Sequence, residues 1–350
     1  MNAIKIKNKL LKLPIIQGGM GIGISRCRLA GAVAKENGMG VISTAQVGYD
    51  APDFSKDPET ANLRILPEQI KKARELSQGN GLIAVNIMAV TRLYEQYVKT
   101  ACDAGVDVII SGAGLPTALP EYVINPDTAI APIVSSEKAA KIILKYWDRK
   151  YKRTADLIII EGPKAGGHLG FSFEQLAQAE QPGYDDEIRR IIAVKQSYEE
   201  KYRTQIPVFT AGGIFTKEDT AHALSLGADG IQAATRFVAT EECDASDAYK
   251  KAYIRAKSED VVIIHSPVGL PGRAIRNDFV RNVEAKSVKI TNCFNCLNAC
   301  NPATAPYCIT QALINAVKGD IRNGLIFCGS RVGEIDRICT VKELMAELAV

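Results

Sequence analysis

The chain has 350 residues, of which 47% are hydrophobic, and a formal net charge of +4. This length is typical of a barrel enzyme with an appendage, and the small charge without a basic run argues against a nucleic-acid partner. Residues 1–16 lack a signal-peptide apolar stretch, and no segment is apolar over the length of a membrane span. The nine cysteines favour reduced thiols in a cytoplasmic protein over a secreted disulfide framework.

Short apolar runs alternate with longer amphipathic segments along most of the chain. The predicted strands are Pro14–Gln17, Gly40–Thr44, Leu82–Asn86, Asp107–Ser111, Ala129–Ser135, Asp156–Glu161, Pro207–Ala211 and Gly230–Ala233. The helices predicted between them include Pro67–Ser77, Leu93–Ala104, Glu137–Tyr151 and Thr216–Leu226. Eight strand–helix units predict an α/β fold of the (β/α)8, or TIM-barrel, class, with an open doubly wound sheet as the alternative.

The repeating pattern ends near residue 240. A helix over Glu241–Ser258 and a short strand VVIIHS are predicted next, followed by a loop-like stretch from Pro267 to Arg281 and a cysteine-rich stretch. We interpret residues 240–309 as an appended cap or substrate domain. Residues 1–239 would form the barrel, completed by 310–350, with terminal helices at Ile309–Val317 and Val341–Leu348. The polar segment Gly48–Asn62 is predicted to be an active-site lid.

The segment Ala155–Gly170, ADLIIIEGPKAGGHLG, carries the strongest indication of chemistry. A run of apolar β-forming residues ends at Glu161, and a glycine-rich loop then presents His168. This pattern predicts a buried parallel strand with a titratable group at its carboxyl end, where α/β folds place their chemistry. His168 is therefore a candidate proton donor or acceptor, with a structural loop histidine as the alternative. We interpret His222 and His265 as structural.

Further glycine-containing strand ends predict a binding site for a phosphorylated cofactor. IPVFTAGGIFTKED places Gly212 and Gly213 before a helix capped by Thr216, where N–H groups and the helix dipole can bind a phosphate. GADGIQAATRF brings residues 232–235 to the end of the eighth strand, and the loops after strands seven and eight form the common phosphate site of these barrels. In PIIQGGMG, residues 14–21, the glycines would let the backbone lie directly against a flat ring system. A tight turn explains the same glycines equally well.

Five of these segments together resemble the FMN-dependent nitronate monooxygenase family, formerly called 2-nitropropane dioxygenases. In chain order they are PIIQGGMG, VNIM, EGPKAGGHLG, PVFTAGGI and GADGIQAATRF. The flavin-dependent enoyl-acyl-carrier-protein reductases of type II share the same motifs in the same order. The similarity runs from residue 14 to about 277 and resumes near Ala312 with ALINAVKGDIRNGLIFCGS. These motifs are specific for the group as a whole but discriminate poorly among its activities.

The resemblance implies an FMN site and a role for each matching residue. His168 would be the catalytic acid/base, Gly19 and Met20 would contact the isoalloxazine ring through their backbone, and Asn86 would lie beside it. The other positions implied to line the cofactor or hold its phosphate are Glu161, Ala165, Gly166, Gly167, Gly212, Gly213, Gln232, Ala234 and Thr235. The chain departs from the family pattern at Ala234, where relatives commonly have glycine, and at residues 135–136, where some nitronate monooxygenases carry a lysine.

Four cysteines in the predicted cap have the spacing C-x2-C-x3-C-x7-C. They are Cys293, Cys296, Cys300 and Cys308. Ferredoxin motifs have the spacing C-x2-C-x2-C-x3-C-P, so the cysteines here are similarly close in the sequence but differently spaced. An iron–sulfur cluster, a four-thiolate zinc site and a loop of reduced thiols without metal all remain open at this point.

The residues and the resemblance together imply an FMN-dependent oxidoreductase with a small-molecule substrate. We expect a nitronate monooxygenase, which oxidises alkyl nitronates with O2 to a carbonyl compound and nitrite. The alternative is an NAD(P)H-dependent reductase of enoyl-acyl-carrier-protein or quinone, with the carrier protein as a partner in the former case. A non-catalytic flavin or redox sensor is supported only by the cysteine motif. A homodimer is among the assemblies that the sequence allows.

Overall fold

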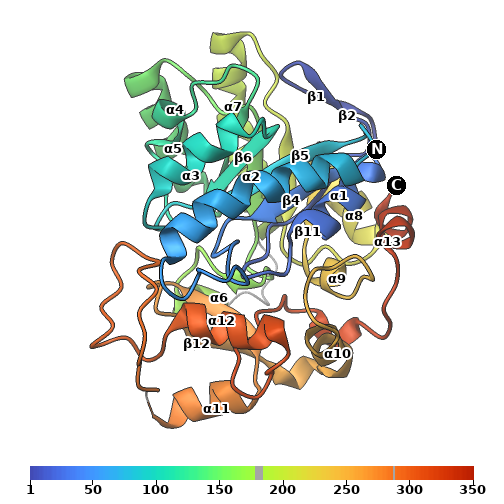
Figure 1. The fold of residues 1–350 in the computed structure, drawn as a ribbon. Coiled ribbons are helices and arrows are strands. Elements are labelled where there is room, and N and C mark those ends of the chain that lie inside the picture. The colour runs from blue at the N-terminus through green and yellow to red at the C-terminus, as the bar shows by residue number, and fades with distance from the viewer. Residues whose placement is uncertain (178–183, 287) are drawn as a thin grey trace.

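Eight parallel strands close into a barrel in the structure, a computed structural model that describes residues 1–177, 184–286 and 288–350 (Figure 1). In order around the barrel they are β3 (Ile15–Gln17), β4 (Met39–Ser43), β5 (Leu82–Met88), β6 (Val108–Gly112), β7 (Ala129–Val134), β8 (Ile158–Glu161), β10 (Val208–Ala211) and β11 (Gly230–Ala233). Pairing of β11 with β3 closes the ring. The predicted (β/α)8 barrel is therefore confirmed, and an open doubly wound sheet is excluded.

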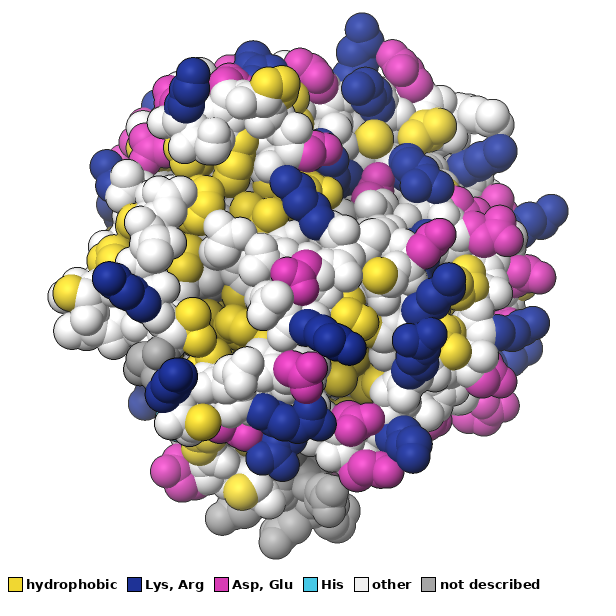
Figure 2. Space-filling view, turned by 60° about the horizontal axis from the view of Figure 1, so that its bottom comes forward, with side chains coloured by type: hydrophobic (Ala, Val, Ile, Leu, Met, Phe, Trp, Pro, Cys, Tyr) yellow, Lys and Arg dark blue, Asp and Glu magenta, His cyan; other side chains and the backbone are white. Residues whose placement is uncertain are grey.

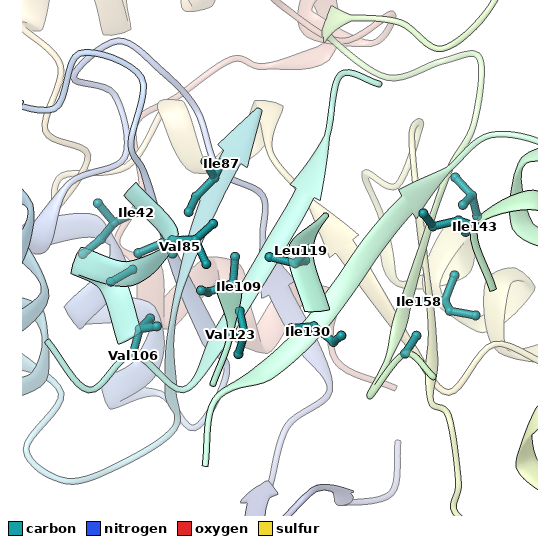
Figure 3. Packing of buried hydrophobic residues seen from close by; sticks show 14 of the residues in the cluster. Ile42, Val85, Ile87, Val106, Ile109, Leu119, Val123, Ile130, Ile143 and Ile158 are labelled. Carbon is teal, nitrogen blue, oxygen red and sulfur yellow. The ribbon is translucent and has the colours of Figure 1, made fainter. Parts of the chain in front are cut away.

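The barrel strands are buried on both faces, which explains why their sequences are continuously apolar instead of alternating. Outward-facing residues such as Val85, Ile109 and Ile130 pack beneath the surrounding helices (Figure 3). Inward-facing residues such as Val41 and Ile159 form a separate cluster inside the barrel. The core is therefore two concentric layers, and the barrel is a packed scaffold instead of a pore.

An N-terminal hairpin belongs to the inner of these two layers. Strands β1 (Ile4–Ile6) and β2 (Lys9–Leu11) pair antiparallel, and their residues Ile6 and Leu11 are buried in the inner cluster. The side chain of Lys9 donates a hydrogen bond to Asp107, which lies just before β6. The hairpin is thus fixed at the amino ends of the strands, opposite the ends from which chemistry is expected.

Helices cover the outside of the barrel. They are α1 (Cys27–Lys35), α2 (Pro58–Leu76), α3 (Tyr94–Asp103), α4 (Leu119–Tyr122), α5 (Glu137–Tyr151), α7 (Tyr184–Tyr202) and α8 (Lys217–Ser225). The prediction that α2 begins at Pro67 is wrong. It begins at Pro58 because Asp57 caps its first turn by accepting a hydrogen bond from the Thr60 N–H, and the first turn tolerates proline. The end of the predicted lid Gly48–Asn62 therefore belongs to a helix.

The region after residue 240 is partly helical. It contains α10 (Asp247–Arg255), β12 (Val261–His265), β13 (Pro271–Ile275) and α11 (Asp278–Ala285). The helix predicted over Glu241–Ser258 is too long. Ser246 caps α10 by accepting a hydrogen bond from the Tyr249 N–H, so the helix begins only at Asp247.

A three-stranded antiparallel sheet joins this region to the barrel. Strand β13 lies between β12 and the short strand β9 (Gly167–His168), which follows barrel strand β8. The prediction that Pro267–Arg281 is loop-like is therefore wrong. The sequence PGRAI has no alternating pattern, and its extended conformation comes from pairing with strands on both sides.

The two predicted terminal helices are confirmed as α12 (Ile309–Lys318) and α13 (Val341–Leu348). Helix α13 packs on α1, α8 and the short helix α9 (Thr235–Val238), whereas α12 packs on α10. Figure 1 accordingly shows α12 beside α10 and α11, below the barrel. No helix in the described parts of the chain is long and apolar enough to span a membrane. On the face in Figure 2, basic and acidic side chains are interspersed.

Candidate active site

The carboxyl ends of the barrel strands surround a cavity of ≈ 230 Å³. The thirteen residues predicted to act on or hold FMN come from several segments between Gly19 and Thr235, and all of them line this cavity. The loop after β8 and the cap sheet form one wall, and the glycine turns after β3, β10 and β11 form others. The barrel thus brings together groups that are far apart in the sequence.

His168 lies where the barrel and the cap meet. It is the last residue of β9, and its register partner on β13 is Gly272. Its Nε2 lies 2.8 Å from the Ser266 hydroxyl, and its ring packs edge-on against Phe327 with the centroids 4.9 Å apart. Burial lowers the pKa of His168 to about 4, so the imidazole is neutral throughout the neutral range. This neutral ring can both accept and donate a proton.

Glu161 ends strand β8 and lines the same cavity. Burial raises the pKa of its carboxyl group to about 8, and the guanidinium of Arg273 partly opposes this effect. Arg273 is itself buried on β13 and donates a hydrogen bond to the carbonyl of Ala165. The Tyr184 hydroxyl donates to the Glu161 carbonyl over 2.8 Å. At neutral pH the cavity therefore contains an uncharged carboxyl group beside the glycine-rich loop.

Two parts of the cavity wall are formed by close approaches of the backbone. Gly19 and Met20 line it beside Asn86, and a Cβ atom on Gly19 would come within 2.5 Å of the Asn86 Cβ. A Cβ atom on Gly166 would come equally close to the backbone carbon of Cys328. Any side chain at these two glycines would displace its neighbours. At both places the cavity wall is backbone without side chains, which leaves room for a flat ring.

A further part of the cavity wall, at one end of strands β10 and β11, combines backbone turns with hydroxyl groups. Gly212 and Gly213 have φ values of 92° and 94°, which side chains rarely adopt. The Thr235 hydroxyl accepts a hydrogen bond from the Gly329 N–H over 3.0 Å. The neighbouring Ser330 hydroxyl is buried and has no hydrogen-bond partner in the structure. Since buried polar atoms are almost always paired, this hydroxyl is available to a ligand.

Arg331 also lines the cavity here, and its guanidinium is ion-paired with both Asp219 and Glu334. Its Nη1 lies 2.6 Å from the Asp219 carboxylate, which also completes the capping box of α8 with Thr216. Its guanidinium carbon lies 4.7 Å from the centroid of the Phe215 ring. The cap of α8, which the sequence predicts as part of a phosphate site, thus also holds an arginine in place.

Several groups of this site have no role predicted from the sequence. The most informative are Ser266, Arg273, Phe327, Gly329, Ser330 and Arg331. Phe327, Gly329 and Ser330 lie in the segment IFCGS, residues 326–330. This segment is part of the family resemblance, but no function was predicted for it. Ser266 and Arg273 reach the site only through the pairing of β13 with β9, which no local pattern indicates.

A second, smaller cavity of ≈ 40 Å³ adjoins the first. His168, Met88, Leu313 and Ala45 line both cavities. The surface that it exposes is mainly apolar, with Ile22, Leu297 and Ile309 among the lining residues, although Glu59 and Arg92 also border it. His168 therefore borders both the cavity with the predicted FMN residues and a smaller, mainly apolar one.

The four cysteines of the cap motif differ in exposure. Cys293 is exposed, whereas Cys296, Cys300 and Cys308 are partly buried, and Cys296 lines the second cavity. Across the described ranges, no group of three or more His, Cys, Asp or Glu side chains is arranged to hold a metal ion. Metal binding by these four residues therefore stays a prediction.

The other two histidines lie away from the first cavity. The Nε2 atom of His222 lies 3.0 Å from the Asp185 carboxylate on the surface. His265 is exposed and packs against Phe173 with ring centroids 4.2 Å apart. Neither is among the lining residues of either cavity, which agrees with the structural interpretation.

Comparison with known proteins establishes the family. A sequence model described as nitronate monooxygenase matches residues 2–350. The chain belongs to the nitronate monooxygenase family. This is a family of oxidoreductases, and its members and their reductase neighbours are flavin enzymes, which implies FMN for this chain.

Relatives in this family and its neighbours have diverged widely. A probable nitronate monooxygenase of Staphylococcus saprophyticus is 25% identical, over 78% of this chain and 78% of the relative. FabK of Thermotoga maritima is 26% identical, with a TM-score of 0.70 over 97% of this chain and 92% of that one. A nitroalkane oxidase of Streptomyces ansochromogenes has the same fold, with 21% identity and a TM-score of 0.72 over 97% and 96% of the two chains.

Proposed function

We propose that this member of the nitronate monooxygenase family oxidises alkyl nitronates, with FMN as cofactor and O2 as co-substrate, to a carbonyl compound and nitrite. The observation that carries the proposal is the position of His168. Its neutral imidazole stands between the cavity with the predicted FMN residues and an apolar extension that suits an alkyl group. A substrate that reaches the flavin from the extension would pass this side chain.

The residues of the first cavity fit FMN at both ends. The Ser330 hydroxyl is buried without a partner and lies beside Arg331, so it suits the phosphate group. The backbone-lined wall at Gly19, beside Asn86, suits the isoalloxazine ring. The bound flavin would supply the redox chemistry, accepting electrons from the substrate and passing them to oxygen.

His168 would handle the proton. A neutral nitroalkane has to lose its α-proton before it becomes a nitronate, and an imidazole with a pKa of about 4 is unprotonated and able to accept it. If Nε2–H donates to the Ser266 hydroxyl, Nδ1 is the nitrogen that accepts the proton. A preformed nitronate needs no deprotonation, and His168 would then only help to position the anion.

The experiment that tests this proposal is an anaerobic absorbance titration of the purified, FMN-loaded protein. We expect propionate 3-nitronate to bleach the flavin bands and nitrite to appear once oxygen is admitted. Bleaching by NADH or NADPH without any response to the nitronate would overturn the monooxygenase proposal. Failure to bind FMN on reconstitution would overturn the flavin assignment as well.

A second candidate function is an FMN-dependent reductase that takes a hydride from NAD(P)H and passes it to an activated alkene or a quinone. The identity of 26% to FabK over almost the whole chain supports it. In this reaction Ser266 would donate to Nε2, and the Nδ1–H of His168 would be free to donate a hydrogen bond that orients the substrate. Turnover of NADPH with crotonyl thioesters or a quinone, in the absence of nitronate activity, would favour this candidate.

We also propose a cytoplasmic location, with the thiols reduced. All nine cysteines are free in the structure, and five of them, including Cys328 and Cys339, are buried or partly buried outside the cap motif. Such thiols are typical of proteins in reducing compartments.

A further inference from the structure

The side chains at the boundary between the two cavities are apolar apart from His168. Met88, Leu313 and Ala45 line both cavities together with this histidine. The second cavity itself exposes a mainly apolar surface. A carbon chain that extends from the first cavity past His168 would therefore exchange water for apolar surroundings, which is favourable.

A loop of the cap forms one wall of the second cavity. Phe294, Cys296 and Leu297 line the cavity on this side. They belong to residues 288–307, a stretch that contains no helix and only an isolated bridge between Leu297 and Thr91. Loops longer than about 12–15 residues without secondary structure are uncommon in compact domains unless they have a function. Closing the second cavity would be such a function.

Contacts with two barrel loops hold this wall in place. In the loop after β5, the Arg92 N–H donates a hydrogen bond to the Cys296 carbonyl over 3.2 Å. In the loop after β4, the ring of Phe54 stacks on that of Phe294 with the centroids 5.6 Å apart, and both rings are buried. Because the backbone around Leu297 is attached to both loops, its side chain lies at a defined place in the cavity wall.

The charged groups at the second cavity are paired with each other. Among the lining residues in the described part of the chain, only Glu59 and Arg92 carry a full charge, and the Arg92 Nε lies 3.1 Å from the Glu59 carboxylate. The buried amide of Asn62 is also satisfied, since it donates to the Gln46 Oε1 over 2.8 Å. The cavity therefore offers an occupant apolar surface, and it offers little to a second charge.

We propose that the second cavity binds the carbon chain of the substrate and that Leu297 sets the length of chain that it accepts. This inference rests on the proposed nitronate oxidation and narrows its substrate class to alkyl nitronates with a short, uncharged chain. About 10–15 Å³ of such volume accommodates one water-sized group, so a cavity of ≈ 40 Å³ accommodates about three methylene groups. The reacting carbon would lie beside His168, and the nitronate of 1-nitrobutane has the chain length that fits.

The test uses straight-chain carboxylates from acetate to octanoate as probes. Their planar anionic group with two oxygens resembles a nitronate but does not reduce a flavin. In calorimetric titrations of the FMN-loaded protein, we expect the affinity to rise about fourfold with each methylene up to pentanoate and then to level off or fall. An affinity that does not depend on chain length would overturn the proposal. Because no turnover is needed, this result is independent of whether the protein oxidises nitronates.

A second charge on the probe distinguishes an alkyl pocket from a site for dicarboxylates. Succinate has the length of butyrate and a second carboxylate at its far end. We expect succinate to bind at least about tenfold more weakly than butyrate, because Arg92 is already paired with Glu59 and the cavity surface is mainly apolar. Binding of succinate as tight as that of butyrate, or tighter, would overturn the proposal.

Variants of Leu297 test its role as the residue that limits chain length. Leu297→Ala should move the optimum from pentanoate to chains longer by about two or three methylene groups, because the truncated side chain leaves that much room. Leu297→Phe should move it to shorter chains. Leu10→Ala is the matched control, because Leu10 is exposed on the hairpin at the opposite end of the barrel, and it should leave the optimum unchanged. If one variant at position 297 does not fold, the other decides, and an unchanged optimum in a folded variant would overturn the role of Leu297.

Discussion

The Nε2 atom of His168 lies 2.8 Å from the Ser266 hydroxyl, although 98 positions separate the two residues in the chain. The hydroxyl also accepts a hydrogen bond from the Val268 N–H over 3.3 Å. It can still either accept from Nε2–H or donate to an unprotonated Nε2. The same contact is therefore compatible with His168 as a base at Nδ1 and with His168 as a hydrogen-bond donor at Nδ1. The cap hairpin, and not the barrel, supplies the group that orients this ring.

Replacing His168 with alanine should separate proton transfer from flavin binding. We expect His168→Ala to bind FMN normally and to oxidise neutral nitroalkanes about 10²–10⁴-fold more slowly, because a general base is lost. Oxidation of the preformed nitronate should be much less affected. Initial rates of nitrite release with both substrates measure the difference. His222→Ala is the control, since this histidine pairs with Asp185 on the surface. Equal losses with both substrates would contradict a role as base.

Replacing Ser266 with alanine should leave the imidazole in place but without its partner. We expect Ser266→Ala to lower kcat with neutral nitroalkane about tenfold, in line with the loss of a group that orients a catalytic side chain. Ser266→Thr should restore most of the rate because it keeps the hydroxyl. Ser197→Ala, on the surface of α7, is the control. If Thr and Ala at position 266 behave alike, the hydrogen bond to His168 is not needed for the rate.

Ser330→Ala tests the phosphate end of the cavity. The hydroxyl has no partner in the protein, so its removal should not destabilise the protein without cofactor. We expect the affinity for FMN to fall about tenfold, corresponding to the loss of one hydrogen bond to a charged group. The affinity for riboflavin, which lacks the phosphate, should not change. Fluorescence titrations with both flavins measure this contrast, and an equal loss for both would place the phosphate elsewhere.

Glu161 predicts a pH dependence of flavin binding. Its carboxyl has a pKa of about 8, so it is neutral in the folded protein below that pH and ionises as the pH rises through 8. We expect FMN binding to weaken above pH 8, because a negative charge then lies beside an anionic cofactor. Glu161→Gln, which cannot ionise, should bind FMN equally well at pH 7 and pH 9. The same decline in both proteins would assign it to another group.

The same carboxyl has a consequence for stability. The unfolded chain ionises Glu161 near its ordinary pKa of 4.5, whereas the folded protein keeps it protonated to about 8. The folded state therefore loses stability as the pH rises from 4.5 through 8. Urea unfolding of the cofactor-free protein should show a smaller decline over this window in Glu161→Gln than in the wild type.

The barrel could be predicted from the sequence because its strands carry continuous apolar runs that a buried parallel sheet requires. Each of the eight runs overlaps a barrel strand, and five of them, for instance the run that ends at Glu161, contain the whole strand. Where the structure depends on long-range pairing, the sequence was a poor guide. Strand β13 has no periodic sequence pattern and forms only because it pairs with β12 and β9. Helix α2 continues through Pro67, although the sequence predicts that the helix begins there.

The residues of the candidate site also fall into two groups: those in local sequence motifs, and those that only tertiary pairing brings to the site. The residues in glycine-rich strand ends were found because short motifs there have recognisable chemistry, and they meet in one cavity. Ser266 and Arg273 were missed because neither belongs to such a motif, and both act on residues about a hundred positions away, namely His168 and Ala165. Their roles follow from tertiary pairing and burial, which a single sequence does not display.

The pairing of β9 with β13 sets a limit on how this chain can vary. Side chains of a strand alternate between its two faces, so a slip of one residue would turn His168 away from the cavity and replace its partner Gly272 with a bulkier neighbour. The turn between β12 and β13, residues 266–270, fixes the register of those two strands and also places Ser266 against His168. An insertion or deletion of a single residue there would therefore move Ser266 away from Nε2 and leave the ring without its partner.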